Sequence, residues 1–256
     1  MRETMTLSWH ITRRNWTVYK KDLFANISPT VADPALIMLS LGLGLGAYLT
    51  DIEGHTYMQY LAPGLPIAAA LFTSFFESSY GFYVRMTFEN VFKAMLTTPI
   101  GVREIVIGEF IWVALKGAAM AVGTSIVLAG LGLMTNPWLL PLMAPIGALV
   151  ALPCGAMGLL STSYVRNINQ FQTVYSFIIA PLYFISGIFF PASQMPQSVK
   201  FIGTLFPMIP GVNAAQAVFW NEGLGNAFLT AIPILIAQSA FFCYFADKRI
   251  RMKLQS

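Results

Sequence analysis

The feature that most constrains this chain is a run of 49 residues, 117–165, that contains no Asp, Glu, Lys or Arg. A helix needs about 20 mostly apolar residues to cross about 30 Å of hydrocarbon, so this run is long enough for two crossings. Hydrophobic residues make up 56% of the 256-residue chain and charged residues only 10%. Soluble domains carry roughly a quarter charged residues. This composition argues against a soluble enzyme, a disordered protein and a disulfide-stapled secreted domain, and it indicates an integral membrane protein.

Uncharged intervals predict six transmembrane helices. The sequence MTNPW at residues 134–138 is a turn signal that divides the long run into two spans. The expected spans are residues 31–50, 59–84, 105–133, 138–164, 168–190 and 224–246. The chain is therefore expected to be an all-α integral membrane protein with a single transmembrane domain over residues 1–256.

The positions of the basic residues predict the orientation of these helices. Thirteen of the 15 Lys and Arg residues fall in the N-terminal segment, the loops after the second and fourth spans, and the C-terminal tail. Cytoplasmic loops carry an excess of Lys and Arg. We therefore expect a multi-pass protein of the cell inner (plasma) membrane with both termini in the cytoplasm. The net charge of +4 then reflects topology, and no nucleic-acid partner is expected.

The segment before the first span, residues 1–28, has the pattern of a basic amphipathic helix. Apolar and aromatic residues recur at helical spacing on one face, and basic residues lie towards the other face and its flanks. These residues are Trp9, Trp16, Tyr19, Leu23 and Ile27 on the apolar face, and Arg13, Arg14, Lys20 and Lys21 around it. Such helices lie in the membrane interface, in contact with lipid, and we expect Ser28 and Pro29 to end this one. A solvated tail with scattered aromatic residues is the alternative.

The cytoplasmic loop of residues 85–104 is longer than a purely topological connection requires. It contains a helical run with an apolar stripe on an otherwise polar surface. The residues of this run that we expect to contact a partner are Phe88, Glu89, Val91, Phe92 and Met95. A short amphipathic helix of this kind is suited to docking on another protein. A helix that lies on lipid headgroups is an alternative that the sequence leaves open.

The segment after the fifth span, residues 191–211, cannot form one straight helix. Its four prolines are Pro191, Pro196, Pro207 and Pro210, and proline in a helix interior kinks or breaks the helix. We expect short outer helices that can re-enter the membrane, packed against protein because irregular backbone at that depth needs polar partners. The segment is a candidate outer gate.

No catalytic or metal-binding constellation is recognisable in the sequence. The two histidines, His10 and His55, fall on opposite sides of the membrane in the predicted topology, so they cannot share a metal ion. A phosphate-binding loop of the form G-x-x-x-x-G-K-[ST] is also missing. We expect that the chain is not an enzyme.

Three ionisable residues within the expected spans are candidates for function. Glu77 lies in the second span, and Glu109 and Lys116 lie seven residues apart in the third. A charge at the bilayer centre costs roughly 2.5–3.5 kcal/mol on insertion scales, so these groups should face the protein interior and find partners. A structural ion pair, Glu109–Lys116 or Glu77–Lys116, and a role in the cargo path both remain open.

Several short motifs occur in an order that is typical of one transporter family. They are Arg14-Asn-Trp16, Ala32-Asp-Pro34, Phe76-Glu-Ser78, Arg85-Met86, Gly108-Glu109, Ser186-Gly187, Phe190-Pro191 and Leu205-Phe-Pro207. In this set the chain resembles an ABC-2-type permease, the membrane subunit of an ABC exporter. The nearest likeness is the nodulation protein J and lipooligosaccharide-exporter group, and it covers nearly the whole chain.

The resemblance implies a transport subunit that works as a dimer of permeases, with a separate ABC ATPase subunit bound to each on the cytoplasmic face. ATP and Mg would be used by that partner, and this chain would bind no cofactor. Residues 85–104 would hold the coupling helix, and residues 191–211 the re-entrant helices at the exit. The cargo would be a glycolipid, a lipid-linked saccharide or an amphipathic drug. We expect a homodimer of permeases, and a dimer of two different permeases is the alternative left open.

Two other kinds of function are weighed against this one. An integral-membrane enzyme that modifies lipid would need a polar catalytic cluster at a membrane surface, and the sequence shows none. A stand-alone channel or secondary transporter would favour an inverted repeat with broken helices in matching halves, and that pattern is not evident.

Overall fold

The computed structural model describes residues 2–46, 48 and 51–255, and over these residues the protein is helical, with no β-strand. Short 3-10 and π-helical segments join several of the helices. The α-helices are α1 (Arg2–Tyr19), α2 (Leu23–Ile37), α3 (Tyr57–Leu61), α4 (Gly64–Phe76), α5 (Phe82–Thr87), α6 (Val91–Leu96), α7 (Val102–Gly130), α8 (Met143–Tyr164), α9 (Gln170–Val174), α10 (Ala180–Phe184), α11 (Gln197–Leu205), α12 (Met208–Trp220) and α13 (Leu224–Gln255).

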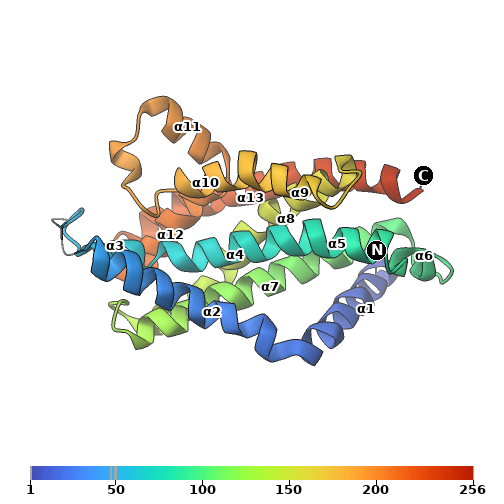
Figure 1. Ribbon diagram of the computed structural model, residues 1–256, viewed down its shortest axis with the longest axis horizontal. Helices are drawn as coiled ribbons and strands as arrows, with labels where there is room; N and C mark the ends of the chain where they lie inside the picture. The colour runs from blue at the N-terminus through green and yellow to red at the C-terminus, as the bar shows by residue number, and fades with distance from the viewer. Residues whose placement is uncertain (1, 47, 49–50, 256) are drawn as a thin grey trace.

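The long helices run side by side and give the molecule two distinct ends (Figure 1). The N-terminus, the C-terminus and α6 lie at one end, which we call the α6 end. Helices α3, α11 and α12 lie at the other, the α12 end. The two termini and the expected coupling helix therefore share one side of the bundle, as the predicted topology requires.

Among the described residues, five helical runs are long and apolar enough to cross a membrane, and a bent helix pair makes a sixth candidate. The five runs are Glu3–Leu43, Tyr57–Thr87, Val102–Gly130, Pro137–Tyr164 and Leu224–Leu254. The bent pair is α11 with α12, which meet at 86°. An all-helical protein with several membrane-spanning helices is thus confirmed. Four of the expected spans, 59–84, 105–133, 138–164 and 224–246, coincide with or overlap single long runs.

The expected span at residues 168–190 differs from the structure. Helix there covers only Gln170–Val174, Tyr175–Ile179 and Ala180–Phe184, which is shorter than the roughly 20 residues that a straight crossing requires. Residues 185–190 are bends and turns, and Gly187 takes a left-handed φ of +85° that is accessible to glycine without strain. The chain therefore leaves the helix early and turns towards the outer segment.

The predicted end of the first helix at Ser28 and Pro29 is wrong. The helix breaks earlier, at the 3-10 turn Lys20–Asp22, and α2 continues through Pro29 to Ile37. A π-helical segment, Met38–Leu43, extends α2 further. Neighbouring groups satisfy the backbone that a proline frees in a membrane helix, so proline is a weak stop signal there. Residues 47, 49 and 50, at the end of the expected span 31–50, lie outside the described residues.

The centre of the bundle depends on small residues that let helix backbones approach one another. A Cβ atom at Gly147 of α8 would lie 2.5 Å from the Cβ of Ala121 and 3.0 Å from the carbonyl oxygen of Gly117, both on α7. A Cβ at Gly211 of α12 would lie 2.6 Å from a methyl carbon of Val150. Close backbone approach through small residues is a common basis of helix association in lipid. These contacts hold α7, α8 and α12 together.

The four prolines of residues 191–211 mark the ends of the short outer helices. Pro196 precedes α11, Pro207 precedes α12, and Pro210 lies in the first turn of α12. Pro191, Pro207 and Pro210 are buried, whereas Pro196 is exposed. Helix α12 is packed into the core, but α11 leaves Phe201 largely exposed. The structure thus contains the expected short helices; their role as an outer gate stays a prediction.

The close contact at Gly147 generates a stability prediction. We expect Gly147→Val to destabilise the protein by about 1–3 kcal/mol, because the added side chain must push α7 and α8 apart. The check is the fraction of detergent-solubilised protein that elutes as a single peak after a series of heat treatments. Gly130→Val is the matched control, because a Cβ there meets nothing within 4 Å. Equal losses for both variants would contradict close packing at Gly147.

Candidate functional site

A network of charged side chains lies inside the helix bundle, centred on Arg85 of α5. The Arg85 guanidinium donates to Glu77 Oε1 at 2.6 Å and to Glu109 Oε2 at 2.7 Å. Exposure of the three side chains is 14% for Arg85, 13% for Glu77 and 1% for Glu109. Charges removed from water need close, hydrogen-bonded partners, and this guanidinium supplies them to two carboxylates at once.

The network extends in two directions from these carboxylates. Lys116 of α7 donates to Glu77 Oε2 at 2.6 Å. On the other side, Asn15 of α1 donates to Glu109 Oε1 at 3.0 Å, and Arg14 donates to Asn15 Oδ1 at 3.1 Å. Side chains from α1, α5 and α7 and the turn after α4 are thus joined in one continuous set of polar contacts. We call the residues Arg14, Asn15, Glu77, Arg85, Glu109 and Lys116 the charge network.

A π-helical turn, Glu77–Gly81, gives Glu77 its position. π-helical turns within α-helices are rare and occur frequently at functional sites. A Cβ on Gly81 would lie 3.4 Å from Arg85 Nη1 and 3.5 Å from Glu77 Oε1, so the missing side chain leaves the path between the two charges open. The Thr162 hydroxyl of α8 lies 3.2 Å from the carbonyl oxygen of Ser78 and 3.4 Å from that of Ser79. This hydroxyl supports the backbone where the turn interrupts regular helical bonding.

The structure selects among the ion pairs that the sequence left open. Lys116 pairs with Glu77, while Glu109 pairs with Arg85. Arg85 was expected at the start of a loop, whereas α5 continues to Thr87 and Arg85 lies within this helix. The signal that could have placed Arg85 in the network is its spacing: Glu77, Gly81 and Arg85 are four residues apart, at helical distance.

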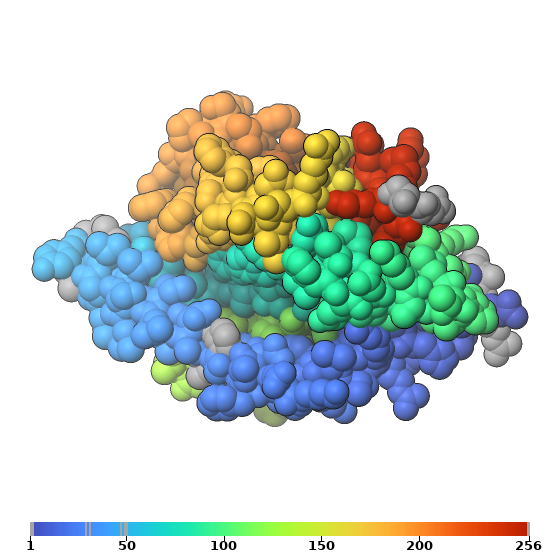
Figure 2. Space-filling view, turned by 45° about the vertical axis from the view of Figure 1, so that its right-hand side comes forward, coloured from blue at the N-terminus to red at the C-terminus, as the bar shows by residue number. Residues whose placement is uncertain are grey.

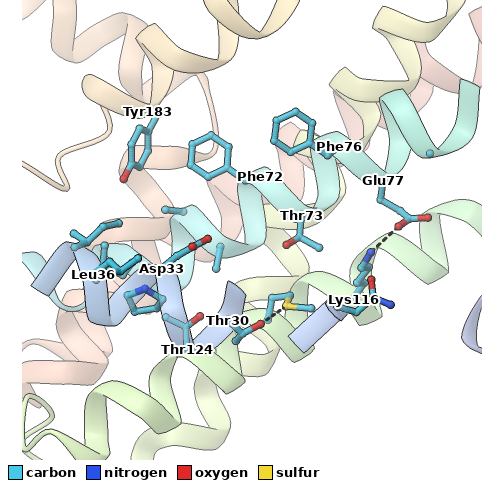
Figure 3. A pocket seen from close by; sticks show the side chains of 18 residues that line it. Thr30, Asp33, Leu36, Phe72, Thr73, Phe76, Glu77, Lys116, Thr124 and Tyr183 are labelled. Atoms are coloured by element: carbon cyan, nitrogen blue, oxygen red, sulfur yellow. Dashed lines mark hydrogen bonds and ion pairs between the residues drawn. The ribbon is translucent and has the colours of Figure 1, made fainter. Parts of the chain in front are cut away.

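A cavity of about 600 Å³ lies beside the charge network, between α2, α4 and α7. Figure 2 shows the hollow between the blue helices at the bottom of the view and the yellow helices above them. In Figure 3, Lys116 and Glu77 stand at one end of the cavity, and Asp33 of α2 and Tyr183 of α10 stand towards the other. Charged groups thus contribute to the wall of a cavity that opens at the surface of the bundle. We call it the central cavity.

The wall of the central cavity is mostly apolar and partly aromatic. Phe72 and Phe76 of α4 lie along it, with ring centroids 6.4 Å apart. The Tyr183 ring meets that of Phe72 edge-on at 4.9 Å. Asp33 adds an exposed carboxylate, which the sequence analysis named only as part of the Ala32-Asp-Pro34 motif and not as a functional group. The cavity therefore offers apolar surface with charges at separate positions.

The residues expected to contact a partner do not all face outward. Phe92 of α6 is only 1% exposed, and its ring packs 4.5 Å from that of Phe82, so it belongs to the protein's own core. Phe88 is 62% exposed, Glu89 is exposed, and Val91 and Met95 are half-buried. Asn90 has a left-handed φ of 52°, which turns the chain between α5 and α6. The surface available at this point is therefore formed around Phe88, without Phe92.

Helix α1 packs on α7 through small and polar residues. The Thr12 hydroxyl donates to the carbonyl oxygen of Gly108 at 3.0 Å, and a Cβ on Gly108 would lie 2.8 Å from that of Ile11. The expected interfacial residues Trp9, Arg13, Trp16, Lys20 and Lys21 are exposed, and Arg14 is half-buried in the charge network. Arg14 thus has a partner within the bundle, which an interfacial helix alone does not require.

Comparison with known proteins assigns the family. Residues 6–220 match the ABC-2 type transporter family. The chain belongs to the ABC-2 type transporter family. This ABC-2 protein is therefore a membrane transport permease, as its motif order indicated. No solved structure matches it.

Named relatives of this ABC-2 permease cover most of its length. Nodulation protein J of Rhizobium leguminosarum bv. viciae is 30% identical over 225 residues, which is 87% of this chain and 86% of the relative. Nodulation protein J of Bradyrhizobium diazoefficiens is 30% identical over 242 residues, covering 94% and 92%. The inner membrane transport permease YadH of Escherichia coli is 21% identical over 182 residues, covering 71% and 70%.

The shared guanidinium leads to a second stability prediction. We expect Arg85→Met to destabilise the permease by about 3–5 kcal/mol, because Glu109 would be left buried with only the Asn15 amide as partner. Arg251→Gln is the control: its ion pair with Asp247 is about one-third exposed and is worth about 0–1 kcal/mol. The measurement is a titration with SDS in which unfolding is monitored by the loss of the helical far-ultraviolet circular dichroism signal. If the two variants unfolded at the same SDS concentration, Arg85 would not be essential to the stability of the charge network.

Proposed function

We propose that this ABC-2 permease is the membrane subunit of an ATP-driven exporter that moves an amphipathic cargo outward, with ATP and Mg bound by a separate ABC ATPase subunit. The α6 end faces the cytoplasm in this proposal, in agreement with the excess of Lys and Arg in the segments at that end. The ATPase docks there, around the exposed Phe88 between α5 and α6. Family membership supports a transport role without an ATPase site in this chain.

The observation that carries the proposal is the path from the α6 end to the central cavity. Phe88 lies three positions after Arg85 in the chain, and Arg85 binds Glu77, which forms part of the cavity wall with Lys116. Helix α1 joins the same network through Asn15. A partner that shifts α5 or α1 therefore moves charges that line the cavity.

A shift of α5 would change the energy of the charge network. Arg85 balances two carboxylates, so a shift of α5 that lengthens one contact leaves that carboxylate with fewer partners in a poorly hydrated interior. Buried charges that lose a partner are costly, and the network has few stable arrangements as a result. ATP-driven motion of the ATPase would switch the network between such arrangements and change the wall that the cargo meets.

The central cavity suits an amphipathic cargo. Its volume of about 600 Å³ lies in the range of roughly 300–1,000 Å³ that is usual for small-molecule sites. Apolar and aromatic walls accept lipid tails or drug-like rings, while Asp33 and Lys116 can bind polar groups. A glycolipid, a lipid-linked saccharide or an amphipathic drug has this combination. Two copies of the permease would complete the path as a homodimer.

The docking part of the proposal is tested at Phe88. We expect Phe88→Asp to lower co-purification with the ATPase subunit at least tenfold, because it places a charge in the contact surface at a side chain that is 62% exposed and contacts the core at the ring of Tyr83. The measurement is the ratio of ATPase to permease recovered on an affinity-tagged permease.

Two other substitutions separate docking from folding in that experiment. Phe201→Asp introduces the same charge at an exposed phenylalanine on the α12 end and should leave the ratio unchanged. Phe92→Asp places the charge in the core and should reduce the yield of folded permease itself. An unchanged ratio for Phe88→Asp would remove Phe88 from the docking surface.

The cavity part of the proposal is tested at Lys116. Glu77 keeps Arg85 as a partner when Lys116 is removed, so Lys116→Met should be tolerated in folding better than Arg85→Met. We expect cargo export to fall at least tenfold while the ATPase still co-purifies. The measurement is cargo profiling of cells that carry each variant in place of the wild type. Export at the wild-type level would leave Lys116 with a structural role alone.

A further inference from the structure

A second cavity, of about 530 Å³, lies between α1 and α7. Aromatic rings form most of its wall, from Trp9, Trp16 and Tyr19 on α1 and Trp112 on α7. Arg13 and Lys116 are its charged residues. Among the described residues, Lys116 is the only one that lines both this cavity and the central cavity. We call it the α1 cavity.

The α1 cavity lies beside a close contact between α1 and α7. The contact of Thr12 and Ile11 with Gly108 brings the two helices together. The large rings beyond it pack against one another instead of closing the gap: Trp16 meets Trp112 at 6.5 Å between centroids, and Tyr19 meets Trp112 at 5.7 Å. Large aromatic side chains of both helices therefore form the wall of the cavity.

The charges around the α1 cavity favour an anion. No acidic residue occurs among its described lining residues. Lys116 is held by Glu77 at 2.6 Å, whereas Arg13 is exposed on α1 and adds a second positive charge to the wall. Lys20 contributes a further positive charge nearby, with its ammonium 4.9 Å from the Trp16 ring centroid.

We infer that the α1 cavity binds an anionic phospholipid of the membrane leaflet at the α6 end. The phosphate lies near Arg13 and within reach of Lys116, and the acyl chains run along the rings of Trp16 and Trp112, away from the α6 end. Basic residues at a membrane surface attract anionic headgroups, and exposed tryptophans favour the boundary between headgroups and acyl chains. The lipid in this site is a bound component of the permease, separate from the cargo in the central cavity.

Tryptophan fluorescence provides a direct test, because three of the five tryptophans line the α1 cavity. The permease is reconstituted in phosphatidylcholine vesicles with a minor fraction of dibrominated phosphatidylglycerol or of dibrominated phosphatidylcholine. Trp138 and Trp220, which lie elsewhere, are replaced by Phe to remove their signal. We expect stronger quenching by the anionic lipid, and Arg13→Gln should lower that preference by about fivefold, the usual contribution of one basic residue at a membrane surface.

Matched variants and a competitor decide the outcome. Arg103→Gln removes an exposed basic residue of α7 that does not line the cavity, and it should leave the preference intact. Inorganic phosphate at millimolar concentration should not relieve the quenching, and relief would mean that free phosphate is the ligand. Equal quenching by the two lipids, or equal losses for Arg13→Gln and Arg103→Gln, would overturn the assignment. The readout needs no ATPase and no cargo, so it is independent of the proposed transport function.

Discussion

The interior of this protein depends on one guanidinium that two carboxylates share. Arg85 holds Glu77 and Glu109, and without it the 1% exposed Glu109 would keep only a neutral amide as partner. Several features of the surrounding helices make this arrangement feasible: the π-helical turn that carries Glu77, the missing side chain at Gly81, and the Thr162 hydroxyl beneath the turn. Charged groups in a bilayer must face protein or water, so the helices that carry these residues can pack in few ways.

Sequence reasoning predicted the placement of most of the long helices, because the bilayer penalises charge so strongly that uncharged intervals indicate the spans. For the same reason it selected Glu77, Glu109 and Lys116 as interior groups. It missed Arg85, because a helix boundary is uncertain by a few residues and an arginine just beyond the predicted end resembles a loop residue. The π-helical turn that aligns Arg85 with Glu77 has no reliable sequence signature.

Local signals failed where lipid or tertiary packing overrides them. Pro29 was read as the end of a helix, but α2 continues past it, as prolines in membrane helices allow. Periodicity grouped Phe88 and Phe92 on one apolar stripe, yet one is exposed and the other lies against Phe82. Periodicity shows that two residues share a face, but it does not show whether that face meets the protein's own core or a partner. Tertiary contacts alone distinguish the two cases.

Lys116 contributes to the walls of both cavities of this permease. Its ammonium binds Glu77 in the wall of the central cavity and lies 5.1 Å from the Tyr19 ring in the wall of the α1 cavity. An anion that approached Lys116 from the α1 cavity would compete with Glu77 and alter the charge that faces the central cavity. Coupling between two binding sites is reciprocal, so a cargo that changed the Glu77–Lys116 contact would change affinity in the α1 cavity by the same factor. Because Arg85 remains bound to Glu77 in either case, the coupling can act without leaving a buried carboxylate unpaired.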